Sequence, residues 1–115
     1  MAELKISERQ AGEITILDMD GKITIGEGSV TLRYTTRRLL SEGKKKILLN
    51  MAGVGYVDSS GLGEFVSSFT AVNKEGGQLK LFNLTQKVRD GLEITTFIKI
   101  FKPYENESEA IASFN

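Results

Sequence analysis

The chain lacks the residue types on which many catalytic and metal sites depend. It has no cysteine, which excludes a disulfide scaffold, a thiol nucleophile, an iron–sulfur cluster and a cysteine zinc site. It has no histidine, which excludes a Ser-His-Asp hydrolase and any metal site that needs imidazole. We therefore expect a protein that is not an enzyme and that uses no metal and no cofactor.

An excess of charge of one sign and long apolar runs are also absent. Fifteen Lys and Arg balance fifteen Asp and Glu, so the formal net charge is zero. This balance argues against direct binding to nucleic acid or to an anionic membrane, because those affinities rest on a basic excess. The longest apolar stretches, such as Ile47-Leu48-Leu49, are far too short to span a membrane, and residues 1–10 do not resemble a signal peptide. We expect a cytoplasmic protein.

The 115 residues, 40% of them hydrophobic, suit one globular domain over residues 1–115. The Asp20-Gly21 pair predicts the turn of an antiparallel hairpin between strands at Ile14–Met19 and Lys22–Ile25. Strands then alternate with helices, which predicts crossover connections and mostly parallel core strands. The fold class is α/β, with a mixed sheet packed against about four helices. Further strands are predicted over 45–51, 78–84 and 97–102, and helices over 29–42, 62–75, 85–93 and 106–114.

The most unusual segment runs from Tyr56 to Gly63 and reads Tyr-Val-Asp-Ser-Ser-Gly-Leu-Gly. It lies where the central strand and its following turn run into a helix. Asp58 or Ser59 can cap the free N–H groups of the first helical turn, and the same end of a helix tolerates a phosphate. Ser59 is expected to stand exposed at the C-terminal edge of the sheet.

A helix cap is the simplest explanation of Asp58 and Ser59. The two glycines indicate a requirement beyond capping, since Gly61 and Gly63 each lose on the order of 1 kcal/mol of helix stability relative to alanine. A cap alone does not require that loss. A surface that another protein's active site must approach closely does benefit from glycine.

These residues resemble a known family. The run Val57-Asp58-Ser59-Ser60-Gly61-Leu62-Gly63 follows Lys-Ile-Leu-Leu-Asn at 46–50 and precedes Gly-Gln-Leu-Lys-Leu at 77–81. In this order of elements it resembles the STAS domain of bacterial anti-sigma factor antagonists over nearly the whole chain. The sequence departs from the commonest pattern of the family at Met51-Ala52-Gly53. Gly55, just before the motif, allows an unusually wide range of backbone conformations.

The resemblance implies a regulator that works by partner switching. The unphosphorylated form would bind an anti-sigma factor that is also a serine kinase, and so free a sigma factor. The kinase would phosphorylate Ser59, the residue after Asp58, and a PP2C-type phosphatase would restore the binding form. Asp58 would shape the turn, while Gly61, Leu62 and Gly63 would form the docking surface.

Several alternatives stay open at this stage. Ser60 is the rival phosphoacceptor, and Tyr34 and Tyr56 are either exposed interface anchors or half-buried core residues. The chain could instead be a STAS-type scaffold or a nucleotide- or partner-sensing adaptor outside sigma-factor control. An enzyme with Ser59 as nucleophile would need a lysine base, and no lysine is close to the motif in sequence.

Overall fold

A computed structural model describes residues 3–93 and 97–114 of the chain. Within these residues lie four strands and five helices. In chain order they are β1 (Leu4–Ala11), β2 (Ile14–Ile23), α1 (Glu27–Ser41), β3 (Lys46–Val57), α2 (Ser59–Lys74), β4 (Gln78–Phe82), α3 (Gln86–Glu93), α4 (Phe97–Phe101) and α5 (Glu107–Ala112).

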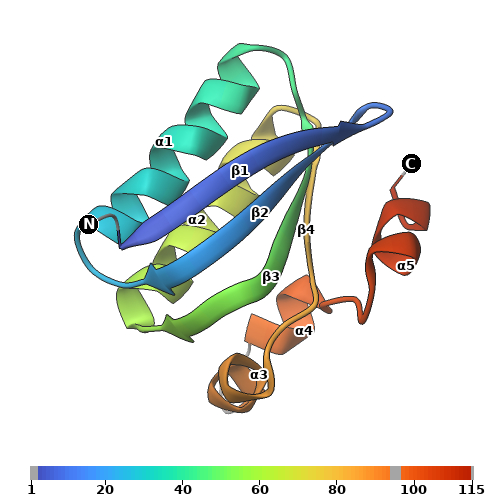
Figure 1. Ribbon diagram of the computed structural model, residues 1–115. Helices are drawn as coiled ribbons and strands as arrows, with labels where there is room; N and C mark the ends of the chain where they lie inside the picture. The colour runs from blue at the N-terminus through green and yellow to red at the C-terminus, as the bar shows by residue number, and fades with distance from the viewer. Residues whose placement is uncertain (1–2, 94–96, 115) are drawn as a thin grey trace.

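The strands form one mixed sheet with the order β1-β2-β3-β4 (Figure 1). β1 and β2 are antiparallel, whereas β2 pairs with β3 and β3 with β4 in parallel. The predicted α/β class, the N-terminal hairpin and the parallel core are therefore confirmed. β3 is the central strand that the aliphatic run at 47–49 predicts, because those three residues are fully buried from both faces of the sheet.

The predicted position of the hairpin turn is wrong. The chain reverses at Gly12, where φ is +63°, and β2 continues straight through Asp20 and Gly21. β1 occupies a polar N-terminal segment for which no strand is predicted. Gly21 serves a close approach instead of a turn, since a Cβ there would lie 2.1 Å from the carbonyl oxygen of Glu3. The Asp-Gly pair therefore lies where the backbone of β2 comes close to the backbone at the start of β1, and not at a turn.

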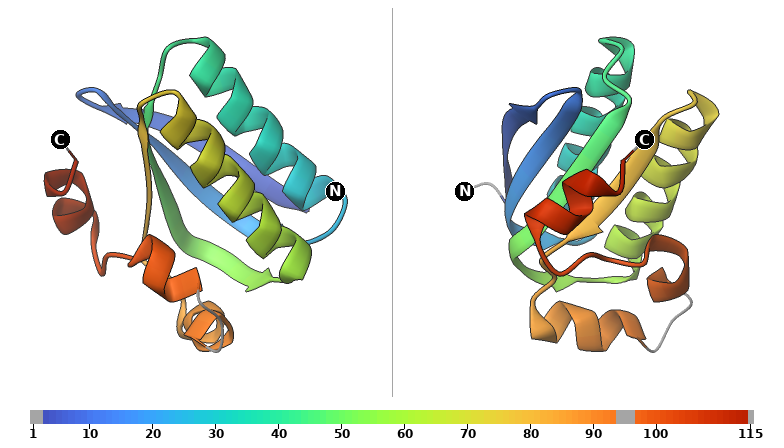
Figure 2. Two further views of the ribbon diagram at one scale, coloured as in Figure 1. Left: turned by 180° about the vertical axis from the view of Figure 1, so that it is seen from behind. Right: turned by 90° about the vertical axis from the view of Figure 1, so that its right-hand side faces the viewer.

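Helices cover the two faces of the sheet unequally (Figures 1 and 2). α1 and α2 lie side by side on one face and bury the larger core, to which they contribute Leu32, Leu39, Phe65 and Val72. α5 lies on the opposite face, where Ala110 packs in a smaller cluster that includes Ile16 and Leu48. α3 and α4 sit near the C-terminal end of β3, so this end of the sheet is bordered by helices.

The predicted helices agree with the structure except at their boundaries and at one segment. α1 begins after Gly26 and not at Ser29, whose buried hydroxyl donates to the carbonyl oxygen of Thr24 at 2.7 Å. Asn106 caps α5 by accepting from the N–H of Glu109. The predicted strand over 97–102 is wrong, because this segment forms the short helix α4. The ring of Phe101 packs edge-on against Phe69, with 5.0 Å between centroids.

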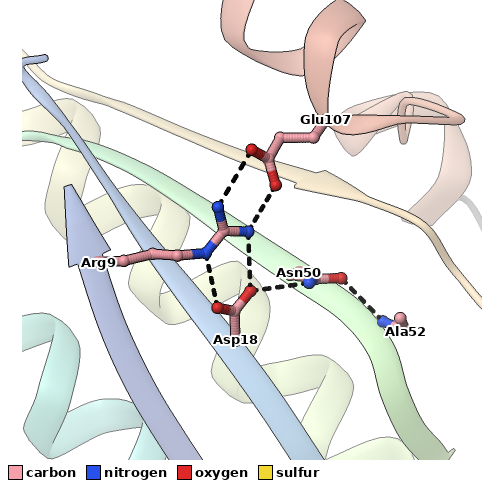
Figure 3. Close-up of polar contacts among 5 residues, drawn as sticks. All are labelled: Arg9, Asp18, Asn50, Ala52 and Glu107. Carbon is pink, nitrogen blue, oxygen red and sulfur yellow. Dashed lines mark hydrogen bonds and ion pairs between the residues drawn. The ribbon is translucent and has the colours of Figure 1, made fainter. Parts of the chain in front are cut away.

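A polar cluster fastens α5 to the sheet (Figure 3). The guanidinium of Arg9 donates to Asp18, with 2.7 Å between Nε and Oδ2, and to Glu107, with 3.1 Å between Nη1 and Oε2. Asn50 donates to Asp18 at 2.7 Å and accepts from the N–H of Ala52. The hydrogen bonds from Arg9 hold the pKa of Asp18 and of Glu107 below their usual range. The cluster therefore depends on both carboxyl groups being ionised.

Candidate functional site

Asp58 joins three segments at the C-terminal edge of the sheet. It lies between the end of β3 and the start of α2, in the extended conformation of an N-cap residue. Its Oδ1 accepts from the N–H of Gly61 at 2.9 Å, and its Oδ2 accepts from the N–H of Ile25 at 3.1 Å. Its own N–H donates to the carbonyl oxygen of Ile23. One carboxylate thus caps α2 and fixes the loop between β2 and α1.

Ser59 and Ser60 are the first two residues of α2, and both are exposed. Neither hydroxyl has a hydrogen-bond partner among the residues that the structure describes. The backbone N–H groups of the first turn of a helix have no intrahelical acceptors. The carboxylate of Asp58 accepts from that of Gly61 and its carbonyl oxygen from that of Leu62, which leaves those of Ser59 and Ser60 without an acceptor among the described residues. The end of the helix next to Ser59 therefore keeps its capacity to stabilise negative charge.

The two glycines of the motif have different roles. Gly61 is buried, and a Cβ there would lie 2.1 Å from the carbonyl oxygen of Ile23. Its missing side chain lets α2 pack against the end of β2, so packing alone already requires a glycine here, and the part of Gly61 in a docking surface stays a prediction. Gly63 is exposed, and a Cβ there would have no neighbour within 4 Å. Of the two glycines, Gly63 is the one that leaves the outer face of the helix without a side chain.

Two irregularities in β3 set the direction of its last residues. Between Asp18 and Asp20 of β2, the paired strand advances from Asn50 to Gly53 and so contains one extra residue. A second extra residue is Gly55, since Gly21 and Lys22 pair with Val54 and Tyr56. Extra residues of this kind bend a strand and re-aim its side chains. They fall at the positions where the sequence departs from the common STAS pattern, and they leave Tyr56 46% exposed beside the motif.

Exposed apolar side chains come from the loop between β2 and α1 and from both long helices. Ile25 is 76% exposed, and the hydrogen bond to Asp58 holds its backbone. Val30 and Tyr34, one turn apart on α1, are 53% and 70% exposed, and Val66 on α2 is 41% exposed. Of the alternatives for Tyr34 and Tyr56, the structure supports exposure. Leu62 is half-buried against the larger core.

An ion pair between the exposed Arg33 and the buried Glu64 joins the two long helices next to the motif. Glu64 is 4% exposed and accepts from Nε of Arg33 at 2.9 Å and from the hydroxyl of Ser68 at 3.2 Å. Sequence reasoning missed this pair, and it also missed Lys87, whose ammonium nitrogen lies 5.9 Å from the ring centroid of Tyr56. Arg33 and Lys87 are far from the motif along the chain, and only the crossover topology brings them close.

Within the described ranges, no group of three or more acidic, cysteine or histidine side chains is placed to hold a metal ion. Over the same residues, every helix is too short or too polar to cross a membrane.

A four-stranded mixed sheet with an Asp-Ser turn at the start of α2 defines a STAS-type domain, and comparison with known proteins agrees. The family model described as "STAS domain" matches residues 5–110. A crystal structure of a Thermotoga maritima protein has a TM-score of 0.86 at 25% identity and covers 95% of this chain and 93% of that one. The anti-sigma-B factor antagonist of Bacillus subtilis is 41% identical over 56 residues, which are 49% of this chain and 51% of the relative.

A structure of the Bacillus cell fate determinant SpoIIAA in its phosphorylated form has a TM-score of 0.70 and covers 94% of this chain and 97% of that one. At 17% identity this likeness shows the fold alone. The chain belongs to the STAS domain family, and its relatives include anti-sigma factor antagonists.

Proposed function

We propose that this chain is an anti-sigma factor antagonist that works in the cytoplasm by partner switching and is not itself an enzyme. Its unphosphorylated form binds an anti-sigma factor with serine kinase activity and so frees a sigma factor. The kinase phosphorylates Ser59 and the complex separates, after which a PP2C-type phosphatase restores the binding form. Residues 1–115 act as one STAS domain with no cofactor. The names of the sequence relatives, anti-sigma-B and anti-sigma F factor antagonists, support the assignment as an antagonist.

The observation that carries the proposal is the position of Ser59. Its hydroxyl is exposed at the first residue of α2, and the N–H groups of the first helical turn lie beside it. A phosphoryl group adds about 1.5 to 2 negative charges at neutral pH, and this end of a helix accommodates such charge. Phosphorylation of Ser59 is therefore expected to leave the fold intact.

The helical positions of the two serines favour Ser59 over Ser60. Residues four apart lie one turn apart on the same helical face. Ser59 is followed one turn later by Gly63, where the surface is open. Ser60 is followed one turn later by Glu64, whose buried carboxylate is already paired with Arg33. A phosphate on Ser60 would bring a second negative group next to that carboxylate, and like charges at this spacing destabilise a helix.

Release follows from the cost of burying the new charge. A partner that covers Ser59 contacts Asp58 and Gly63, together with the exposed Tyr56 and the half-buried Leu62. It accepts a neutral hydroxyl but must desolvate a dianion after phosphorylation. A penalty of about 3 kcal/mol weakens binding by roughly two orders of magnitude.

The test is to incubate wild type, Ser59→Ala and Ser60→Ala with ATP and soluble lysate of the source bacterium, followed by intact mass and phosphopeptide mapping. We expect one phosphate on wild type and on Ser60→Ala and none on Ser59→Ala. Thermal unfolding of each variant shows whether it is folded. Phosphate on Ser59→Ala but not on Ser60→Ala would move the switch to Ser60.

A second measurement tests release. The kinase retained by immobilised Ser59→Ala is identified, purified and titrated against wild type before and after phosphorylation. We expect the phosphorylated form to bind about a hundredfold more weakly. Equal affinity of the two forms, or no phosphate on any form in lysate with active serine kinases, would favour a STAS-type scaffold in which Asp58-Ser59 is only a helix cap.

A further inference from the structure

An apolar hollow opens beside the motif, between the end of β3, the start of α2 and α3. Its volume is about 240 Å³, and its lining includes Val57, Leu62, Val88 and Leu92. Val88 and Leu92 are almost fully buried, while Leu62 is half-buried. The hollow is therefore a gap over the core that none of the described side chains fills.

A second, broader hollow adjoins the first and brings positive charge to it. The two share Gly55, Tyr56 and Lys87, and the second adds Lys22 from β2. Lys22 and Lys87 are both exposed, and neither forms an ion pair with a carboxylate of the described residues. The ammonium group of Lys87 lies over the ring of Tyr56 instead. Two unpaired cations thus flank an apolar cavity.

The size and charge of these hollows indicate what occupies them. Cavities that hold small organic ligands usually measure about 300–1,000 Å³, so the apolar hollow of about 240 Å³ suits one large side chain. The adjoining hollow, of about 550 Å³, has two lysines in its lining and leaves room for a charged group beside that side chain. Interfaces between proteins are commonly anchored by a single side chain in a well-packed pocket. The two lysines would pair with a carboxylate beside that anchor.

We propose that the hollow receives a large apolar side chain of the protein partner, next to an acidic residue of that partner that pairs with Lys87 and Lys22. Leu62 belongs both to the motif that carries Ser59 and to the wall of the hollow. One partner can therefore cover both, and its identity as the anti-sigma factor rests on the function proposed above. The apolar anchor supplies affinity that does not depend on the hydroxyl of Ser59.

The test uses the isotope-labelled full chain and acetylated, amidated dipeptides followed by NMR. We expect aspartyl-phenylalanine to shift the amide signals of Gly55, Leu62 and Gly91. Lysyl-phenylalanine and aspartyl-alanine should each bind at least about fivefold more weakly, because one loses the charge pair and the other the anchor.

Three variants locate the binding site. Lys87→Gln should weaken aspartyl-phenylalanine about fivefold. The matched control is Lys45→Gln, which removes an exposed lysine near the hairpin turn and should change nothing. Gly91→Leu should abolish binding by filling the hollow. It should still fold, since a Cβ at Gly91 has no neighbour within 4 Å.

The proposal is overturned if no signal at the hollow moves up to about 10 mM dipeptide, or if aspartyl- and lysyl-phenylalanine bind equally. It is also overturned if free 3-phenylpropionate binds more tightly than the dipeptide, which would indicate a small-molecule site. The assay contains neither kinase nor ATP. Its failure therefore leaves the Ser59 switch standing, and failure to phosphorylate Ser59 leaves these binding results unchanged.

Discussion

At the scale of single residues, the two glycines of the motif look equivalent in the sequence but have different surroundings in the structure. Gly61→Ala is expected to lower the free energy of unfolding by about 1–3 kcal/mol, because the new methyl group meets the carbonyl oxygen of Ile23. The matched variant Gly63→Ala should raise it by about 0.5–1 kcal/mol, since alanine is the better helix former and the position is open. Urea unfolding of the three proteins measures both. Equal effects of the two substitutions would contradict the packing described for Gly61.

Asp58 shows how far the sequence predicts the site at this scale. Its place after a strand and before a helix predicts the N-cap, and the hydrogen bond to Gly61 confirms it. Its second bond, to the N–H of Ile25, joins residues 33 apart in sequence and could not be predicted. Local capping follows rules of spacing, whereas a contact across a crossover depends on how the elements pack.

At the scale of elements, the attachment of α5 should depend on pH. The pKa values of Asp18 and Glu107 are lowered in the folded protein by the hydrogen bonds from Arg9. A lowered folded-state pKa means that the cluster stabilises the protein above the unfolded values of about 4 and loses this effect as pH falls through the lowered ones. We expect amide exchange in α5 to become faster, relative to that in α2, between about pH 5 and pH 2.

Two variants check this assignment. Arg9→Met should make exchange in α5 fast already at neutral pH and remove most of the acid dependence. Lys46→Met is the control, because it removes the partner of another carboxylate with a lowered pKa, Glu13, and leaves Arg9, Asp18 and Glu107 in place. If Lys46→Met changed α5 as much as Arg9→Met does, the cluster in Figure 3 would not be what holds this helix.

Short elements were the hardest to predict. The run Phe-Ile-Lys-Ile-Phe at 97–101 has the composition of a strand but forms α4. Five residues carry too little periodic signal to distinguish a strand from a helix. β4 already has β3 on one side, and on the other it bridges to Tyr104, so residues 97–101 do not pair in the sheet. Tertiary packing, such as the contact of Phe101 with Phe69, outweighs the local strand propensity of this segment.

At the scale of the whole molecule, α5 is expected to be required for stability. The fully buried Ile16 and Leu48 face the cluster to which α5 contributes Ala110. Ending the chain at Glu105 removes this cover, and we expect the free energy of unfolding to fall by about 3 kcal/mol or more. Urea unfolding and binding of a hydrophobic dye measure the loss. Unchanged stability without dye binding would show that α5 is dispensable.

The sequence by itself determined the class of fold, the order of most elements and the position of Ser59 at the start of α2. These features depend on local periodicity, on capping chemistry and on a motif of consecutive residues, all of which can be read along the chain. Only the tertiary structure decided where the hairpin turns, what Gly61 is for, and that Lys22 and Lys87 flank a hollow next to Leu62. These features depend on which distant residues meet, and that is fixed by sheet pairing and packing.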